Sequence, residues 1–284
     1  MALIDRLYEV NRRIPKRQYY PLFVNGTKVG QVDVQLLDAL KPPLFCIDNA
    51  FKTVNMSFAS ESCHQFEDEL ADFFVDFFAH RGLSGWRDER YAVKACHGSP
   101  TLFLLERAAL SYLGITGYGV HVNGYVKKSD GIHMWVAKRA SNKPTSPGKY
   151  DQIAAGGQPH DLSVWENMIK ECQEEASIPE WLAKTAVPAS AISYRYDLPI
   201  GLRPDVIFNY DLCLPADFVP TVNDDEVESF MCVPIHDLLD WVAGTQDFKF
   251  NSAVVIIDFA IRHGLIGPEH SDYLRLQQGM YQPL

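Results

Sequence analysis

The chain has 284 residues, of which 47% are hydrophobic and 22% charged, so it can bury a sizeable core in one large domain or two ordinary ones. Its formal net charge is −10 and it has no run of four Lys or Arg, which argues against nucleic acid and anionic membrane surfaces as partners. No apolar stretch approaches the roughly 18–20 residues that span a bilayer, the first ten residues do not resemble a signal peptide, and the six cysteines show no CxxC spacing; we therefore expect a cytoplasmic protein with reduced thiols.

Residues 1–115 predict a mixed α and β domain. Two strands should pair around Asn25-Gly26, the strongest short hairpin signal, and they span 20–24 and 29–34. A helix should begin at Ser62, with Gln65 in the position of a capping box, and end at Gly82. The phenylalanines repeated along that helix indicate a core-facing stripe.

A second helix fits Ser99–Leu113, because Pro100 suits its first turn and Gly114 stands just past its end. From residue 116 to residue 284, strands precede and follow one long helix and two helices close the chain, which favours a layered α/β domain. The predicted strands are 119–126, 133–138, 153–157, 191–196, 206–212 and 227–233, and the predicted helices begin at Ser163 and span 236–242 and 252–262.

The most informative segment is residues 154–179. Ser163 is a good helix N-cap, and Glu166 stands three residues later, which completes a Ser-x-x-Glu capping box. Pro179 forbids continuation of the helix and marks its far end.

This helix has two predicted faces. Its buried stripe should consist of Trp165, Ile169, Cys172 and Ala176. Glu171, Glu174 and Glu175 fall in a separate arc, where like charges destabilise a bare helix by about 0.2–0.5 kcal/mol per pair. A solvated acidic face and a set of hard oxygen ligands for a divalent cation both explain them. The Gly156-Gly157 turn upstream favours the cation, because glycine lets the backbone approach a metal closely and a carbonyl could join the carboxylates.

The same segment resembles a Nudix box, the family pattern Gly-x5-Glu-x7-Arg-Glu-apolar-x-Glu-Glu-x-Gly-apolar. The positions that match are Gly156, Lys170 in place of Arg, Glu171, Cys172, Glu174, Glu175 and Ile178. Two positions depart from the pattern, since Leu162 stands at the first Glu and Ser177 replaces the late Gly. Glu166 is either a displaced substitute for that first Glu or the helix cap, and we favour the cap.

The resemblance implies an α/β/α sandwich with a mixed sheet over residues 116–284, preceded by a smaller α+β N-terminal domain. It implies a hydrolase that cleaves a diphosphate with Mg²⁺ or Mn²⁺, which agrees with the need for cations between a diphosphate and a carboxylate cluster. The metal ligands would be Glu171, Glu174 and Glu175, with the Gly156 carbonyl and a later carboxylate, for which we choose Glu226 over its reading as part of an exposed acidic turn. Glu174 and Glu171 are the catalytic candidates.

Three cations are candidates for binding the distal phosphate. Lys138, Arg139 and Arg203 flank segments that should converge on the box, although each also fits an ordinary surface charge. Lys170 should orient Glu171, and His121, in an apolar strand, reads as a core histidine.

Further segments resemble the Nudix subfamily related to the region fused to thiamine pyrophosphokinase in some fungi. They are 106–109, 117–125 and 210–215. This resemblance implies thiamine diphosphate or its oxo- or oxy-analogues as substrate, hydrolysed to the monophosphate and phosphate. ADP-ribose, a nucleotide sugar or a dinucleotide remains an alternative substrate, and a non-catalytic ligand-binding protein remains an alternative class. The family resemblance also makes a homodimer an expectation.

Overall fold

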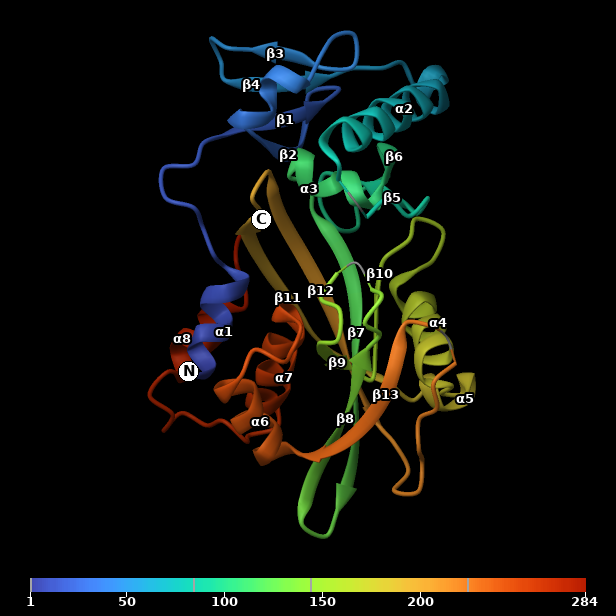
Figure 1. Cartoon of the computed structure of the whole chain (residues 1–284), viewed down its shortest axis with the longest axis vertical. Coiled ribbons are helices and arrows are strands. Elements are labelled where there is room, and N and C mark those ends of the chain that lie inside the picture. The colour runs from blue at the N-terminus through green and yellow to red at the C-terminus, as the bar shows by residue number, and fades with distance from the viewer. Residues whose placement is uncertain (1, 84, 144, 224) are drawn as a thin grey trace.

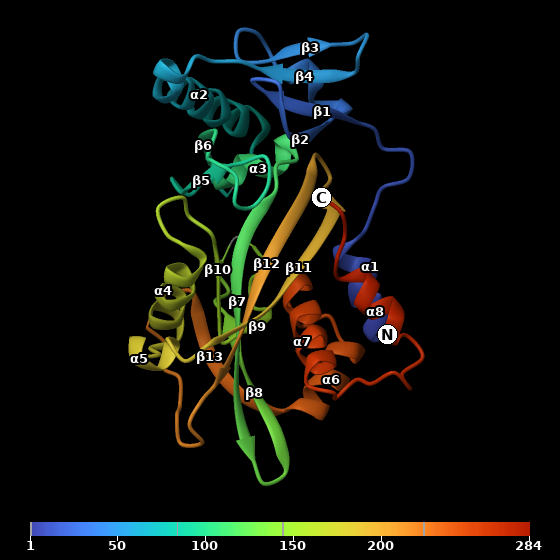
Figure 2. The same ribbon diagram turned by 180° about the vertical axis from the view of Figure 1, so that it is seen from behind.

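A computed structural model of the chain describes residues 2–83, 85–143, 145–223 and 225–284, and Figures 1 and 2 show it from opposite sides. A smaller unit built from residues 19–113 lies at one end of a long, twisted sheet (top in Figure 1). Helices cover both faces of that sheet in either view.

The N-terminal unit contains a four-stranded sheet in the order β2-β1-β4-β3 and a two-stranded sheet β5-β6. Its strands are β1 (Tyr19–Val24), β2 (Thr27–Asp33), β3 (Cys46–Asp48), β4 (Thr53–Met56), β5 (Arg90–Val93) and β6 (Phe103–Glu106). Its helices are α2 (Cys63–Arg81) and α3 (Leu110–Leu113), with short 3-10 turns at Val34–Ala39, Ser60–Ser62 and Arg107–Ala109.

The predicted hairpin and the predicted helix are confirmed. Gly82 ends α2 in the left-handed conformation, at φ 60°. Phe66, Phe74 and Phe77 of α2 are buried in the core of the unit, as the stripe predicted. The capping box at Ser62 was wrong, because the Ser62 side chain caps nothing.

The helix predicted over residues 99–113 was wrong in its first half. Residues 103–106 form strand β6, which pairs antiparallel with β5 through Phe103↔Val93. Only residues 107–113 are helical, and Gly114 ends them at φ 58°. Short apolar runs do not distinguish a helix from a buried strand by periodicity, and here the partner strand decides.

The long sheet has the order β11-β12-β7-β8-β13, with β10 paired to β7 and β9 paired to β8. Strands β7 and β12 run parallel and the other pairs are antiparallel, so the sheet is mixed. The strands are β7 (Gly117–Lys128), β8 (Gly131–Arg139), β9 (Tyr150–Gln152), β10 (Ala154–Gly157), β11 (Val187–Asp197), β12 (Leu202–Cys213) and β13 (Val227–Pro234). All six predicted strands are confirmed, with β9 added.

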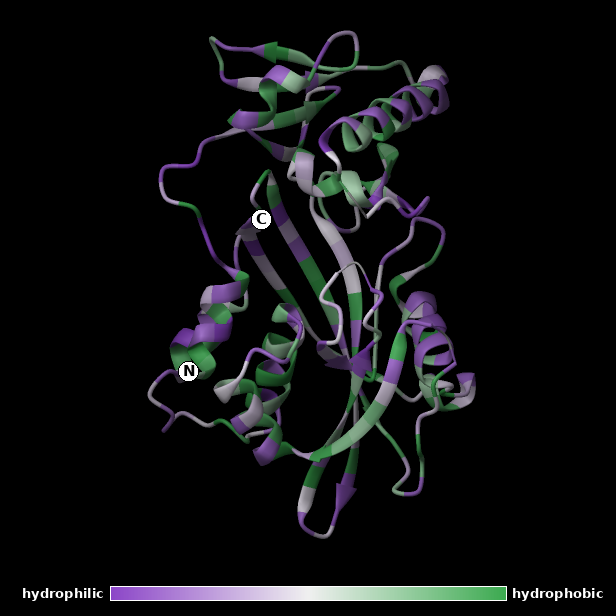
Figure 3. Ribbon diagram, viewed as in Figure 1, coloured by the Kyte–Doolittle hydropathy of each residue, from purple (hydrophilic) through white to green (hydrophobic). Residues whose placement is uncertain are grey.

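Two helical layers enclose this sheet, which confirms the predicted α/β/α sandwich. Helices α4 (Val164–Ala176) and α5 (Glu180–Ala183) cover one face, and α6 (Ile235–Gly244) and α7 (Phe250–Arg262) cover the other. Residues 253–257 of α7 are all apolar and fully buried (Figure 3). Each valine and isoleucine among them stabilises the fold by about 1.5–3 kcal/mol.

The chain termini complete the α6–α7 layer. Helix α1 (Leu3–Val10) packs on α7, and α8 (Tyr273–Gly279) packs on α1. The predicted boundary near residue 115 falls between α3 and β7, but the apolar residues of α1 lie in the core of the second unit. The N-terminal unit rests closely on the long sheet, since a Cβ on Gly201 would lie 2.4 Å from the Ser111 carbonyl oxygen of α3.

None of the helices built from the described residues combines the length and apolarity needed to cross a membrane.

Candidate functional site

Helix α4 begins with the predicted capping box. The Ser163 hydroxyl accepts the Glu166 backbone N–H at 3.2 Å, and the Glu166 carboxylate accepts the Ser163 backbone N–H at 2.9 Å. Glu166 therefore completes the helix cap with Ser163, and its side chain is exposed. The helix ends at Ser177, which adopts φ 52°, the left-handed conformation for which the family pattern has glycine.

Strand β10 lies directly against α4 along three consecutive residues. The contacts pair Ala155 with Glu175, Gly156 with Glu171, and Gly157 with Asn167. The first and third are hydrogen bonds of 2.8 Å, from the Ala155 N–H to Glu175 Oε2 and from Asn167 Nδ2 to the Gly157 carbonyl. In the second, a Cβ on Gly156 would lie 2.2 Å from the Glu171 carboxyl carbon. The diglycine is the end of a strand rather than a turn, and its lack of side chains lets the helix carboxylates approach the backbone.

The prediction that the three glutamates form one face away from the buried stripe was wrong. Glu175 is only 5% exposed and the Glu171 side chain 13%, whereas the Glu174 side chain is 50% exposed. The fully buried positions of α4 include Met168, Cys172 and Ala176, while Trp165 and Ile169 are only partly buried. The helix is therefore rotated from the expected orientation, because the β10 backbone donates to Glu175 and stabilises it inside.

The buried positions of Glu171 and Glu175 disfavour the charged form of both carboxyls when no cation is bound. Burial raises the pKa of Glu175 well above its ordinary value, and the charge of Glu171 raises it further. Burial also raises the pKa of Glu171, against the opposing effect of Lys170. Lys170 Nζ lies 3.3 Å from Glu171 Oε1 and 2.5 Å from Glu174 Oε2, in agreement with the expected orienting role of Lys170.

The described residues do not contain three or more His, Cys, Asp or Glu side chains gathered as metal ligands. Glu174 points to Lys170 at the surface, so the expected trio is not assembled. The donor chemistry nevertheless suits a hard divalent cation, because Glu171 and Glu175 offer buried carboxylate oxygens beside the Gly156 backbone. The assignment of ligands therefore stays a prediction.

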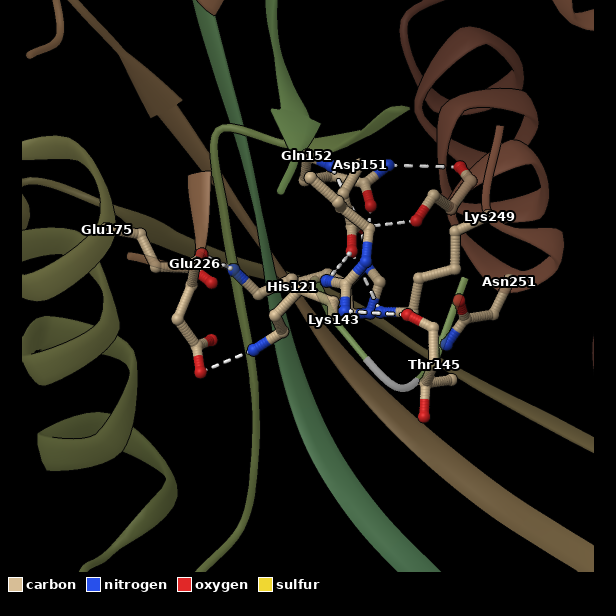
Figure 4. A network of polar contacts seen from close by, with 12 residues as sticks. His121, Lys143, Thr145, Asp151, Gln152, Glu175, Glu226, Lys249 and Asn251 are labelled. Carbon is tan, nitrogen blue, oxygen red and sulfur yellow. Dashed lines mark hydrogen bonds and ion pairs between the residues drawn. The ribbon is translucent and has the colours of Figure 1, made fainter. Parts of the chain in front are cut away.

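Glu226 lies close to this pair of carboxylates. The negative charge of Glu226 raises the pKa of both Glu171 and Glu175. The Glu226 carboxylate itself forms an ion pair with Lys143 (Figure 4). Its backbone carbonyl accepts the Ala140 N–H at 2.9 Å, which fixes it at the start of β13. The structure thus places the expected later carboxylate near the box.

A buried polar network that the sequence did not predict lies on the opposite face of the sheet, around Asp151 (Figure 4). Its carboxylate accepts from Arg139 Nη1 at 3.1 Å, from Lys249 Nζ at 2.9 Å and from the Ser252 hydroxyl. Burial alone would raise the pKa of Asp151, but Lys249, His121 and Arg139 hold it below its usual range. His121 is buried as expected of a core histidine, and burial lowers its pKa to about 4.

The three cations expected to bind phosphate have carboxylate partners. Arg139 is held in the network by Asp151, Lys138 Nζ lies 2.9 Å from Glu228, and Arg203 Nε lies 2.7 Å from Asp205. Substrate binding by each of them stays a prediction.

The N-terminal unit also reaches the diglycine. A Cβ on Gly157 would lie 1.5 Å from the Tyr91 hydroxyl and 3.5 Å from the Arg107 guanidinium carbon. The loop after β10 is tied to the same unit, because the His160 N–H donates to the Arg90 carbonyl at 3.2 Å. Nothing in the sequence pointed to Tyr91, and the one signal for Arg107 was its place in the segment 106–109.

Comparisons with known proteins find one family profile and several similar curated proteins. The profile of a family described as "Domain of unknown function (DUF4743)" matches residues 2–117. The chain is 46% identical to each of two Arabidopsis thaliana proteins, "Nudix hydrolase 20, chloroplastic" and "Nudix hydrolase 24, chloroplastic". These matches cover 69% and 71% of this chain but 52% and 56% of the plant proteins, so the chain spans about half the length of those relatives.

A third relative is similar along the whole chain. The "Uncharacterized protein YJR142W" of Saccharomyces cerevisiae (strain ATCC 204508 / S288c) is 32% identical, and the match covers 100% of this chain and 91% of the yeast protein. The yeast protein is therefore similar to this chain across both units, and the match spans nearly the whole length of each protein.

Proposed function

Because the chain belongs to the Nudix hydrolase family, we propose that it hydrolyses a diphosphate linkage with the aid of a divalent cation, Mg²⁺ or Mn²⁺. As the substrate we propose thiamine diphosphate or its oxo- or oxy-analogues, which give the monophosphate and phosphate. The proposal has a small-molecule diphosphate as partner and involves neither nucleic acid nor membrane.

One observation carries the proposal, namely two buried carboxyls pressed against the backbone of a glycine strand end. Glu171 and Glu175 lie in an acidic chain, at positions where burial and mutual repulsion disfavour both charges. Buried charges of this kind are retained when they are paired or bind a cation. A bound divalent ion would neutralise charge on the diphosphate and lower the pKa of a water molecule.

The residues divide these tasks by their exposure. Glu171 and Glu175, with the Gly156 carbonyl and Glu226, would hold the ion. Glu174, the half-exposed member of the set, would accept a proton from the attacking water while the new P–O bond forms and the bond to the bridging oxygen breaks. Lys170 contacts both Glu171 and Glu174 and would orient them.

An aromatic surface beside the box supports a substrate with a flat ring. The rings of Tyr118 and Phe208 are within 11° of parallel, with centroids 6.3 Å apart, and His97 of the N-terminal unit packs on both. Tyr118 also adjoins the diglycine strand, since its carbonyl accepts the Gln158 N–H at 2.9 Å. This surface suits a pyrimidine, a thiazolium or an adenine, so the thiamine assignment rests on the short sequence matches.

The test is a hydrolysis assay of the purified chain with Mg²⁺ or Mn²⁺. The panel is thiamine diphosphate, its oxo-derivative, ADP-ribose and NADH, with released phosphate and nucleotide products as the readout. We expect phosphate release from the thiamine diphosphates, and turnover of only ADP-ribose or NADH would replace the substrate proposal.

A matched pair of variants identifies the catalytic carboxylate. Glu174→Gln should abolish turnover, whereas Glu180→Gln should leave it unchanged. Glu180 is 56% exposed and pairs with a lysine four residues away at 2.6 Å, as Glu174 does at 2.5 Å. Equal loss of activity in both variants would contradict the role of Glu174.

Leu162 favours a second candidate, a ligand-binding Nudix protein without turnover, because it replaces the first Glu of the box. Saturable binding of a panel member with no hydrolysis under either metal would favour this candidate.

A further inference from the structure

Gly156 and Gly157 face opposite sides of β10, as consecutive strand residues do. Gly156 faces the Glu171 carboxylate, whereas Gly157 faces Tyr91 and Arg107 of the N-terminal unit. The Tyr91 hydroxyl is buried, with the whole residue 5% exposed, and forms no hydrogen bond with any other residue that the structure describes. This buried hydroxyl beside the backbone of the box therefore keeps a hydrogen-bond donor that a bound anion could accept.

Arg107 is held firmly at its base but has an accessible side chain. The buried Glu106 carboxylate accepts backbone N–H groups of Arg87, Glu89 and Ala108 at 3.0–3.2 Å and so fixes the turn that carries Arg107. The Arg107 guanidinium lies 5.8 Å from the centre of the Tyr91 ring and donates through Nη1 to Glu89 at 2.9 Å. Its side chain is 44% exposed, and a guanidinium with five N–H donors keeps capacity for a second anion.

The charges around Arg107 are those of the hydrolase site. The charge of Arg107 lowers the pKa of Glu226, and the charge of Arg203 lowers the pKa of Arg107. The charge of Glu171 raises the pKa of the Tyr91 hydroxyl. Arg107 is thus within electrostatic range of the box carboxylates, and an anion bound there through a cation could also accept hydrogen bonds from its guanidinium.

We infer that the N-terminal unit completes the diphosphate site, with Arg107 binding the phosphate group on the side of Gly157 and Tyr91 positioning Arg107. This inference rests on the proposed function for the position of the carboxylate-bound ion. It assigns the unit that matches the domain of unknown function a direct part in binding an organic diphosphate.

The experiment measures binding without turnover, by calorimetric titration of the full chain with methylenediphosphonate in Mg²⁺. Arg107→Gln should weaken binding about ten- to a hundredfold, because it removes a charge-assisted contact to phosphate. Arg107→Lys keeps the charge without the planar fork and should recover part of the loss. Arg90→Gln is the matched control, since the Arg90 side chain is 45% exposed, lies on the same unit and pairs with Asp68 at 3.5 Å; it should bind within about twofold of the wild type.

The hydrolysis panel, run on the same proteins, separates this inference from the proposed function. Hydrolysis by the wild type that Arg107→Gln leaves unchanged in KM, with unchanged binding, would overturn the inference and keep the hydrolase. Binding that depends on Arg107 without turnover of any substrate would keep the inference and overturn the hydrolase. Absence of methylenediphosphonate binding to the wild type would overturn the inference.

Discussion

Buried His121 should make folding stability depend on pH between about 6.5 and 4. Burial and the nearby charge of Lys249 lower its pKa from 6.5 to about 4, against the opposing effects of Asp151 and Gln152. In the unfolded chain the imidazole binds a proton near pH 6.5, so between these values the unfolded state binds more protons and stability falls as the pH falls. The total is about 3 kcal/mol, of which about 2 kcal/mol is lost between pH 7 and pH 5.

Urea unfolding at pH 7, 6 and 5 measures this loss. His121→Asn is the test variant, because its amide N–H₂ can replace Nδ1 as the donor to Gln152 Oε1. Its free energy of unfolding should fall by about 2 kcal/mol less than that of the wild type between pH 7 and pH 5. His80→Asn, at an exposed histidine, should behave as the wild type. Asp151 does not interfere, since its lowered pKa places its own loss of stability below pH 4. Parallel pH profiles for His121→Asn and the wild type would refute the reasoning.

Three further predictions concern the box. Gly156→Ala places a Cβ 2.2 Å from the Glu171 carboxyl carbon, so we expect a loss of about 1–3 kcal/mol in urea unfolding and loss of turnover; a normal rate would show that Glu171 need not stay there. Ser177 adopts the left-handed conformation that glycine tolerates better, so Ser177→Gly should raise the free energy of unfolding by about 0.5–1 kcal/mol with no change in kcat. A lower melting temperature of this variant would contradict the prediction. Glu166→Ala should lower the melting temperature through loss of its bond to the Ser163 N–H, yet leave kcat within about twofold; a large fall in kcat in the folded variant would make Glu166 the displaced box carboxylate.

The sequence predicted the elements around the box better than their orientation. The start and end of α4 follow from local chemistry, at Ser163 and Pro179, and local chemistry is readable in a single chain. The rotation of α4 depends on the Ala155 N–H, a donor that the sequence gives no reason to aim at Glu175. Helical periodicity therefore placed the three glutamates together, whereas the strand separates Glu174 from the other two.

Long-range contacts explain the remaining failures. Residues 103–106 contain an apolar run that is compatible with a helix, and only pairing with β5 makes it a strand. The Asp151 network joins residues of β8, β9 and α7 that are 12 to 101 positions apart in the sequence. No local sequence motif therefore predicts it. Tyr91 lies 66 positions before Gly157 and meets it only because the N-terminal unit rests on the end of the sheet.

The two adjacent glycines connect these findings. A side chain at Gly156 would displace the Glu171 carboxylate, and a side chain at Gly157 would displace Tyr91, so one strand end brings both units to the same site. If the N-terminal unit only stabilised the fold, the contact at Gly157 would need no cation, yet the Arg107 guanidinium carbon lies 3.5 Å from the position of a Gly157 Cβ and its side chain is 44% exposed. A metal between carboxylates neutralises one side of a diphosphate, and the other side still carries charge that a guanidinium can bind. The N-terminal unit is therefore expected to affect KM through Arg107, whereas the carboxylates of α4 affect kcat.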